Sequence, residues 1–376
     1  MPIPPAYDVA VIGLGPVGAA LAAALAGRGL RVVALEKGTA AHALPRAAHL
    51  DGWALRTLAE VGVRPDGREL DGFDLVDRRG RLLLRGRPRQ APPPGFPPGL
   101  LVHQPSVERA LRSRLGAVGV HVRLGHAVAE VGEAGAGVEV GGEGLDGRFA
   151  ARASFAVGCD GARSAVRQSM GAAWVGGGFE QKWLVVDVRL RRPTALPERL
   201  LQIADPARPT TFVPFAGPRR RWEFRRMPGD GDLTDPATVR ALLSAHVAPG
   251  AVEVERAAVY TFRDVVAERW RRGRVLLAGD AAHQMPPFLG QGLGAGLRDV
   301  AALAPLLVQA VRAGSPDGLD AYERARRPHV RATVRQSVRL GRLVTLPEPW
   351  ATVRDRALRT GLRVPGLGRW LRDVRG

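Results

Sequence analysis

Apolar and small residues alternate over the first 36 positions in an order that predicts strand, helix and strand. Residues 7–12 (YDVAVI) are apolar and partly β-branched, as in a buried strand. Residues 19–26 are alanine and leucine, which favour a helix, and residues 31–35 (RVVAL) form a second apolar run. Such a unit predicts a parallel sheet with helices packed against it.

The middle of the chain changes character twice. Six prolines within residues 85–99 predict a loop. From residue 183 to 224, short strand-like runs are separated by proline and glycine, which is typical of an antiparallel sheet. Helices are also expected over 51–61, over 106–115 with Ser106 as N-cap, and over 293–312 and 350–375, and strands over 121–131, 137–140 and 275–279.

These patterns predict an α/β fold in which a Rossmann-like domain is interleaved with an antiparallel-sheet domain and followed by a C-terminal helical segment. Because a buried strand and helix return after residue 274, the first domain must be discontinuous. Its expected segments are 1–70, 100–175 and 270–330. The antiparallel sheet is expected from 71–99 and 176–269, and the C-terminal helices from 331–376.

Composition narrows the class of protein. Hydrophobic residues make up 45% of the chain and charged residues 24%, which excludes a disordered chain. One cysteine, Cys159, excludes a disulfide framework and a cysteine-based zinc site, and the histidines lack metal-ligand spacing. The net charge of +19 raises nucleic acid as a partner, but the arginines are scattered and only 3 tyrosines are available for base stacking. We therefore expect no nucleic acid and no metal.

A membrane location is also not expected. Residues 9–27 carry no charge, but this stretch contains three glycines and a proline within residues 13–18 and lacks the basic start and the cleavage site of a signal peptide. The sequence therefore predicts a cytoplasmic protein that does not bind membranes.

The motif Gly13-Leu14-Gly15-Pro16-Val17-Gly18 follows the first strand and opens the first helix. In a dinucleotide-binding unit, the first glycine makes the turn, the second lets a pyrophosphate approach, and the third lets helix and strand pack closely. Glu36 ends the second strand, where a ribose hydroxyl needs an acceptor. Since a carboxylate disfavours a 2′-phosphate, the motif predicts FAD or NAD rather than NADP.

Two further motifs lie downstream. Residues 274–300 (RVLLAGDAAHQMPPFLGQGLGAGLRDV) place Asp280 at a strand end and Gly290 and Gly292 at a helix start, where backbone N–H groups can face an anion or an electron-rich ring. Residues 157–167 (VGCDGARSAVR) contain Asp160-Gly161, which alone is equally compatible with an ordinary turn.

Together these motifs resemble the group A flavoprotein aromatic hydroxylases, the p-hydroxybenzoate hydroxylase-like family, nearest the branch that acts on 3-(3-hydroxyphenyl)propionate and polyketide aromatics. The segments LPRAAHLDG, QPSVERAL and WLVVDVRL share the resemblance, which covers essentially the whole chain. It implies a set of FAD-binding residues. They are Gly13, Gly15, Pro16, Val17, Gly18, Glu36, Lys37, Arg46, Gln104, Val128, Asp160, Gly279, Asp280, Pro286, Gly290, Gly292, Leu293 and Gly294.

The resemblance implies an FAD-dependent monooxygenase. NAD(P)H would reduce the flavin, O₂ would add to give a hydroperoxide, and one oxygen would pass to an aromatic, phenolic or polyketide-like substrate. The alternative is a biosynthetic enzyme of the same fold that uses FAD structurally for a non-redox cyclisation or rearrangement. An aromatic pocket is expected from Trp183, Phe212, Phe215, Trp222 and Phe288, although each of them taken individually is more typical of the core. No catalytic base can be assigned from the sequence.

The C-terminal part of the chain differs from that branch, whose members usually continue into a thioredoxin-like domain. Residues 321–376 carry 14 arginines and four acidic residues. The expected partner is a second copy of the chain, in a homodimer, or an acidic carrier protein, and the basic segment is the feature that suggests the carrier.

Overall fold

The computed structural model describes residues 6–40, 48–70, 72–87 and 91–361. Its first sheet contains β1, the strand that directly precedes the glycine-rich motif. Strands β18, β11, β1, β2 and β8 run parallel in that order, and β17, β10 and β9 add antiparallel partners. The strands are β1 (Tyr7–Ile12), β2 (Val32–Glu36), β8 (His121–Leu124), β9 (Ala127–Ala134), β10 (Gly137–Gly144), β11 (Gly147–Gly158), β17 (Arg271–Arg272) and β18 (Val275–Leu277).

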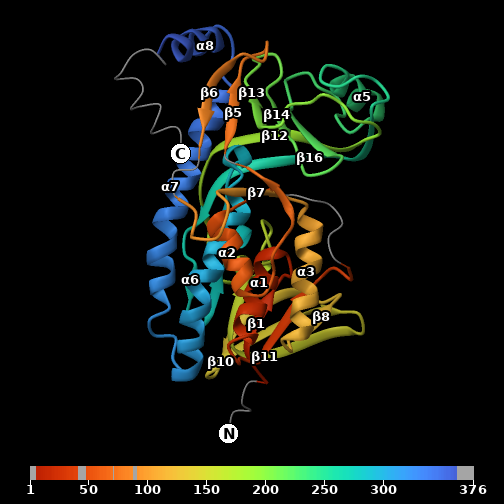
Figure 1. Cartoon of the computed structure of the whole chain (residues 1–376). Helices are drawn as coiled ribbons and strands as arrows, with labels where there is room; N and C mark the ends of the chain where they lie inside the picture. Colours follow the sequence, from red (N-terminus) through yellow and green to blue (C-terminus); the bar gives the residue numbers. More distant parts are fainter. Residues whose placement is uncertain (1–5, 41–47, 71, 88–90, 362–376) are drawn as a thin grey trace.

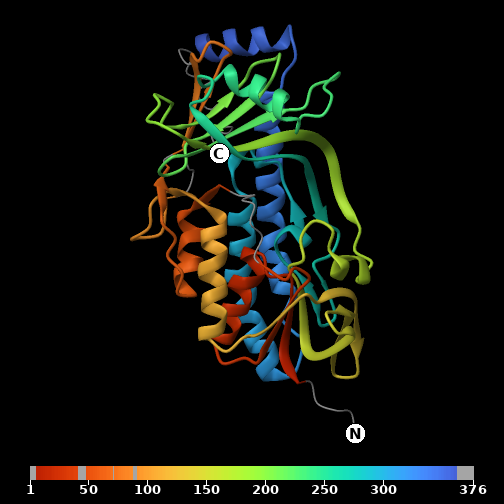
Figure 2. The ribbon, with the colours of Figure 1, turned by 90° about the vertical axis from the view of Figure 1, so that its right-hand side faces the viewer.

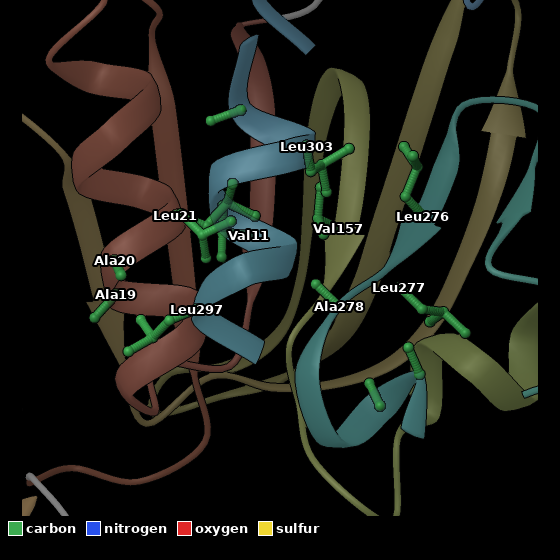
Figure 3. Packing of buried hydrophobic residues seen from close by; sticks show 14 of the residues in the cluster. Val11, Ala19, Ala20, Leu21, Val157, Leu276, Leu277, Ala278, Leu297 and Leu303 are labelled. Atoms are coloured by element: carbon green, nitrogen blue, oxygen red, sulfur yellow. The ribbon is translucent and has the colours of Figure 1, made fainter. Parts of the chain in front are cut away.

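Apolar side chains of this sheet are covered by helices from distant parts of the chain. The helices are α1 (Pro16–Ala26), α2 (Gly52–Glu60), α3 (Gln104–Ala117) and α6 (Gly292–Ala313). Figure 3 shows Leu21 of α1 and Leu297 of α6 in the same core as Val11 of the sheet. Helices α1 and α6 approach closely because Gly296 has no side chain; a Cβ there would lie 2.5 Å from Cγ2 of Val17.

The second sheet lies above the first in the view of Figure 1 and is mostly antiparallel. Its strand order is β19-β16-β12-β15-β14-β13-β5-β6, and β13 pairs with β5 in parallel. The strands are β5 (Phe73–Val76), β6 (Leu82–Gly86), β12 (Trp174–Leu190), β13 (Leu200–Ile203), β14 (Thr210–Val213), β15 (Arg219–Arg225), β16 (Val252–Ala267) and β19 (His283–Gln284). Helix α5 (Pro236–Ser244) packs against the face of this sheet that carries Trp222 and Phe224.

A small third sheet joins the two halves. It has the order β3-β7-β4 and consists of β3 (His49–Asp51), β4 (Gly67–Glu69) and β7 (Gly99–Val102). Three short elements complete the described part: α4 (Ala165–Ser169) and the 3₁₀ turns η1 (Gly279–Ala281) and η2 (Pro287–Leu289).

Helix α7 (Asp320–Val344) runs beside both large sheets, and α8 (Trp350–Gly361) crosses the end of the second one (Figures 1 and 2). At the C-terminal end of α7, the C-cap residue Thr345 accepts hydrogen bonds from Gln181 of β12 (3.3 Å) and from Arg225 of β15 (3.2 Å). Closer to the first sheet, Tyr322 donates to the carbonyl of Leu277 (3.0 Å). One helix therefore connects the two sheets.

The predicted fold class is confirmed: strands of the two large sheets interleave along the chain, and helices follow at the C-terminal end. The domain boundaries stay a prediction. The predicted N-cap Ser106 is wrong, because α3 already begins at Gln104 with His103 as N-cap; Pro105 fits the first turn and brings Ser106 inside the helix. The loop predicted over 85–99 is too long at both ends, because β6 extends to Gly86 and β7 begins at Gly99.

Helix α6 is the one helix in the described part of the chain that is long and apolar enough to cross a membrane, and 61% of its apolar window is buried inside the fold. That burial is typical of a core helix. The cytoplasmic location stays a prediction.

Candidate active site

The glycine-rich motif forms a cradle at the start of α1. A Cβ on Gly13 would lie 2.6 Å from the carbonyl oxygen of Cys159, and one on Gly18 would lie 1.9 Å from the carbonyl oxygen of Gly13. A Cβ on Gly15 would meet no atom within 4 Å. The backbone is therefore tightly packed at the first and third glycines and borders open space at the second.

Helix α1 presents unbound N–H groups to that space. Its N-cap, Gly15, has no side chain that could accept from the first turn, Pro16 follows as the first helical residue, and the first turn contains no acidic residue. The side chain of Val17 packs against Gly279 and Gly296. An uncapped helix start beside an open glycine is a binding site suited to a pyrophosphate.

Glu36 lies beside the same turn at the end of β2. Its carboxylate accepts hydrogen bonds from the N–H of Leu14 (2.7 Å) and of Gly38 (2.9 Å), and each oxygen keeps a second lone pair. Lys37 is exposed. Val128 is half-buried on β9, two residues after His126, whose N–H donates to the carbonyl of Glu36 (2.9 Å). Glu36 is thus placed where a nucleoside bound beyond the glycine cradle could reach its carboxylate.

On the other side of the cradle, a buried carboxylate holds the η1 turn. Asp299 accepts from the N–H of Gly279 (3.1 Å), from Nε2 of His283 (2.7 Å) and from Nε of Arg326 (2.9 Å). Burial alone would raise the pKa of Asp299, but His283 and Arg326 hold this pKa below its ordinary value. The ionised carboxylate thereby fixes the backbone that presents the exposed Asp280.

A second uncapped helix start lies at α6. Ser337 of α7 donates to the carbonyl of Pro286, and Gly290 ends η2 with a φ of 64°, a conformation that favours glycine. Helix α6 then begins at Gly292, and its N-cap Gln291 makes no capping bond. Leu293 is half-buried and Gly294 buried.

The two helix starts fit an extended dinucleotide. One would face the pyrophosphate and the other an electron-rich ring, and α1 and α6 pack side by side. The remaining predicted binding residues are placed as follows. Gln104 is buried and donates to Glu108 (2.7 Å). Asp160 accepts from the N–H groups of Ala165 (2.7 Å) and Val166 (3.3 Å), and burial raises the pKa of its carboxyl group. Arg46 lies outside the described residues.

A cavity of about 320 Å³ adjoins the start of α6. It lies between α2 with β3 on one side and α7 on the other, and the first residues of β5 and β13 in the second sheet also line it. Its apolar lining includes Trp53, Leu70, Phe73, Leu200, Phe288 and Leu289, and its polar lining includes His49, Asp51, Arg87, Gln291, Arg298, His329, Thr333 and Gln336.

The polar wall of this cavity is ordered by an ion pair. Arg298 lies 2.8 Å from Oδ2 of Asp51, whose Oδ1 accepts from the N–H of Ala54 (3.0 Å) and so caps α2. Nδ1 of His49 lies 3.4 Å from the carbonyl oxygen of Gly290. Burial lowers the pKa of His49 below its ordinary value, although Asp51 opposes this, so the imidazole is neutral at neutral pH.

The five aromatic residues expected in a pocket are not gathered in one place. Phe288 lines the cavity and packs edge-on against Trp183, with ring centres 5.5 Å apart. Phe215 packs with Leu70 beside the small sheet. Phe212 and Trp222 instead join the core under α5, because side chains alternate between the faces of a strand and these two point away from the cavity.

The sequence interpretation missed the polar wall. The histidines were considered in the sequence only as metal ligands, which their spacing does not support, but His49 and His329 both line the cavity. His49 and Asp51 lie two and four residues after the LPRA segment (residues 44–47), so their position in the LPRAAHLDG motif was an available signal. No local pattern marks His329, Thr333 or Gln336, which are brought to the cavity by helix packing.

Comparison with known proteins shows the family of the chain. A family model described as an FAD binding domain matches residues 6–337. A probable NADH-specific resorcinol 4-hydroxylase from Rhodococcus jostii is 38% identical over 352 residues, which are 91% of this chain and 66% of that protein. A 3-(3-hydroxy-phenyl)propionate/3-hydroxycinnamic acid hydroxylase from Mycobacterium sp. is 37% identical over 382 residues, covering 98% of this chain and 66% of that protein.

A solved structure extends the likeness. The ternary complex of aklavinone-11 hydroxylase with FAD and aklavinone matches with a TM-score of 0.78 and 26% identity, over 89% of this chain and 68% of that chain. The predicted family resemblance is thus confirmed. The chain spans just under two thirds of the length of the two curated relatives.

Proposed function

Because the chain belongs to the FAD-binding domain family, we propose that it is a monooxygenase that hydroxylates a small phenol with NADH and O₂. FAD is its cofactor and supplies the electron transfer from NADH to O₂ that amino-acid side chains do not provide. In the balanced reaction, one oxygen atom enters an aromatic C–H bond and the other leaves as water, while NADH and one proton are consumed and NAD⁺ is formed. NADH is proposed as the donor because the resorcinol hydroxylase relative is NADH-specific.

The protein's own contribution is to bind, orient and shield. The N–H groups at the start of α1 would hold the pyrophosphate, and Glu36 would accept from the ribose hydroxyls. The start of α6 would stabilise negative charge on the reduced ring system. Asp299, which accepts a hydrogen bond from the N–H of Gly279, would keep the backbone of Gly279 and Asp280 in position.

The observation that carries this proposal is the cavity beside Gly290 and Gln291. It adjoins the helix start assigned to the reactive ring, and it combines apolar walls with one polar wall. Its volume of about 320 Å³ lies at the lower end of the roughly 300–1,000 Å³ usual for ligand pockets. A single phenolic ring therefore suits it better than a fused tetracycle.

The test uses purified protein with FAD, NADH and either resorcinol or 3-(3-hydroxyphenyl)propionate under ¹⁸O₂. We expect a yellow protein, phenol-dependent NADH oxidation, and a product that carries one ¹⁸O atom. A protein that binds no FAD, or whose NADH oxidation no phenol stimulates and which yields no labelled product, would contradict the proposal. Product formed without O₂ and with the flavin kept oxidised would establish the non-redox alternative instead.

A further inference from the structure

We propose that the outer face of helix α7 binds an extended, acidic segment of another protein. This face carries a row of six arginines, the arginine ridge, which consists of Arg324, Arg327, Arg331, Arg335, Arg339 and Arg342. Helix α7 runs along the outer edge of the molecule in Figure 1, and the described lining of the active-site cavity includes none of these six side chains. A binding role of the ridge is therefore independent of the proposed function.

The spacing of the six arginines places them in a single row. At about 100° per residue, their positions fall within about a third of the circumference of an α-helix. Arg326 lies on the opposite side of α7, where it is buried and pairs with Asp299 (2.9 Å). The helix thus separates one arginine that is paired inside the fold from a row that faces solvent.

The ridge has almost no counter-charge of its own. Arg327 is half-buried and pairs with Glu323 (2.8 Å), whereas the other five arginines are exposed and none of them forms an ion pair with a described residue. Residues 324–344 contain no aspartate and no glutamate. Like charges three or four residues apart destabilise a helix, so the row is unfavourable for α7 until an opposite charge covers it.

The N-terminal half of the ridge borders a hollow in the surface. The hollow has a volume of about 810 Å³, and the ridge contributes Arg324, Arg327, Arg331 and Arg335 to its lining. Two carboxylates also line it, but both are already paired, Asp320 with Arg271 (2.6 Å) and Glu323 with Arg327. The guanidinium groups therefore dominate the charge that a ligand meets there.

The dimensions of the ridge suit an extended peptide. From position 324 to position 342 the helix rises about 27 Å, which about eight residues of an extended chain span. Neighbouring arginines of the row lie about 4.5–6 Å apart along the axis, and every second side chain of an extended chain recurs after about 6.6 Å on the same face. A guanidinium can bind a carboxylate through two parallel hydrogen bonds. Aspartate or glutamate at alternate positions can therefore pair with successive arginines.

Other occupants fit the ridge less well. A second copy of the chain carries the same net charge of +19 and is repelled by it. Residues 324–342 contain no phenylalanine, tyrosine or tryptophan on which a nucleic-acid base could stack. The apolar residues Val330, Val334 and Val338 of α7 are buried in the fold, so they are not available to enter a membrane.

The test measures how the FAD-loaded protein binds a fluorescein-labelled peptide of alternating glutamate and serine, by fluorescence anisotropy at low ionic strength. The ridge variant combines Arg331→Glu, Arg335→Glu and Arg339→Glu. We expect the peptide to bind the wild type with an affinity that falls as salt is added. The ridge variant should bind it about tenfold more weakly or worse, because three attractive charge pairs become repulsive.

A control variant separates the ridge from the net charge of the chain. It combines Arg78→Glu, Arg191→Glu and Arg240→Glu, which change the net charge by the same amount at three exposed arginines that form no ion pair with a described residue. We expect its Kd for the peptide to stay within about threefold of the wild-type value. Phenol-dependent NADH oxidation should be equal in the wild type and the ridge variant.

Equal weakening in both variants, or no binding of the peptide by the wild type, would overturn the proposal. An oligonucleotide of the same charge, or a vesicle of phosphatidylserine and phosphatidylcholine, that binds the ridge more tightly than the peptide would also overturn it, as would self-association that the ridge variant loses. Absence of phenol-dependent NADH oxidation in the wild type would contradict the proposed function alone. If the ridge variant does not fold, glutamine at the same three positions provides the comparison.

Discussion

Replacing Asp299 by asparagine removes one charge from the buried cluster that links η1, α6 and α7. The carboxylate is fully buried and accepts from Arg326, His283 and the N–H of Gly279. Asparagine keeps the size of the side chain but leaves the guanidinium of Arg326 buried without its counter-charge. Breaking a buried ion pair in this way costs about 3–5 kcal/mol of unfolding free energy.

That loss predicts a measurable fall in melting temperature. With an unfolding entropy of about 2.1 cal/mol/K per residue, a chain of 376 residues loses about 1.3 °C per kcal/mol, so Asp299→Asn should melt about 4–6 °C lower. Circular dichroism of the FAD-free protein at pH 7 measures this. The control is Glu180→Gln, which breaks the half-exposed ion pair with Arg263 and should change stability by less than about 1 kcal/mol.

The pH dependence has a defined sign. Since the folded protein holds the pKa of Asp299 below its ordinary value, the stabilisation is present above the unfolded pKa of about 3.9 and is lost as the pH falls through the lower folded value. The gap between wild type and Asp299→Asn should therefore be constant near neutral pH and narrow in acid. A variant that melts within one degree of the wild type at pH 7 would refute this reasoning.

Three further predictions follow from the cofactor cradle and the thiol of Cys159. Gly18→Ala places a Cβ 1.9 Å from the carbonyl oxygen of Gly13, so it should lower the free energy of unfolding by about 1–3 kcal/mol and also weaken FAD binding. The Cβ of Gly15→Ala meets no atom of the protein, so this variant should weaken FAD binding in a flavin-fluorescence titration while its melting temperature stays unchanged. Equal melting temperatures of the two variants would contradict this. Glu36→Ala leaves the N–H of Leu14 without its acceptor and should raise the Kd for FAD about 5- to 150-fold; an unchanged Kd would argue against the assigned role. Burial raises the pKa of the Cys159 thiol, so it should react with a thiol reagent at pH 8 only after unfolding, and rapid labelling of the native protein would show otherwise.

The elements of the first sheet could be predicted because their signals are local. Residues 7–12 carry a complete strand pattern, and β1 has these same bounds. The glycine motif also fixes its own geometry, because Gly13 and Gly18 are packed too tightly for any side chain. The helix expected over 293–312 differs from α6 by one residue at each end.

The cavity could not be predicted, because its walls are distant in sequence. His49 meets Gly290 across 241 residues, and this meeting depends on how β3 packs against the start of α6. The orientation of Phe212 and Trp222 was equally inaccessible, since it depends on strand register, and a shift of one residue turns every side chain to the opposite face. Local patterns identify the elements but not which of their faces meet.

The pairing of β5 with β13 has a consequence for exchanging specificity between relatives. These strands lie side by side in parallel, with Leu75 opposite Gln202, although more than a hundred residues separate them along the chain. Phe73 of β5 and Leu200 of β13, which are paired partners, both belong to one wall of the cavity. A chimaera that transplants only residues 174–267 would join a foreign strand to a native neighbour along that wall. Recombination must move residues 73–86 in the same step, so the two segments should be inherited together.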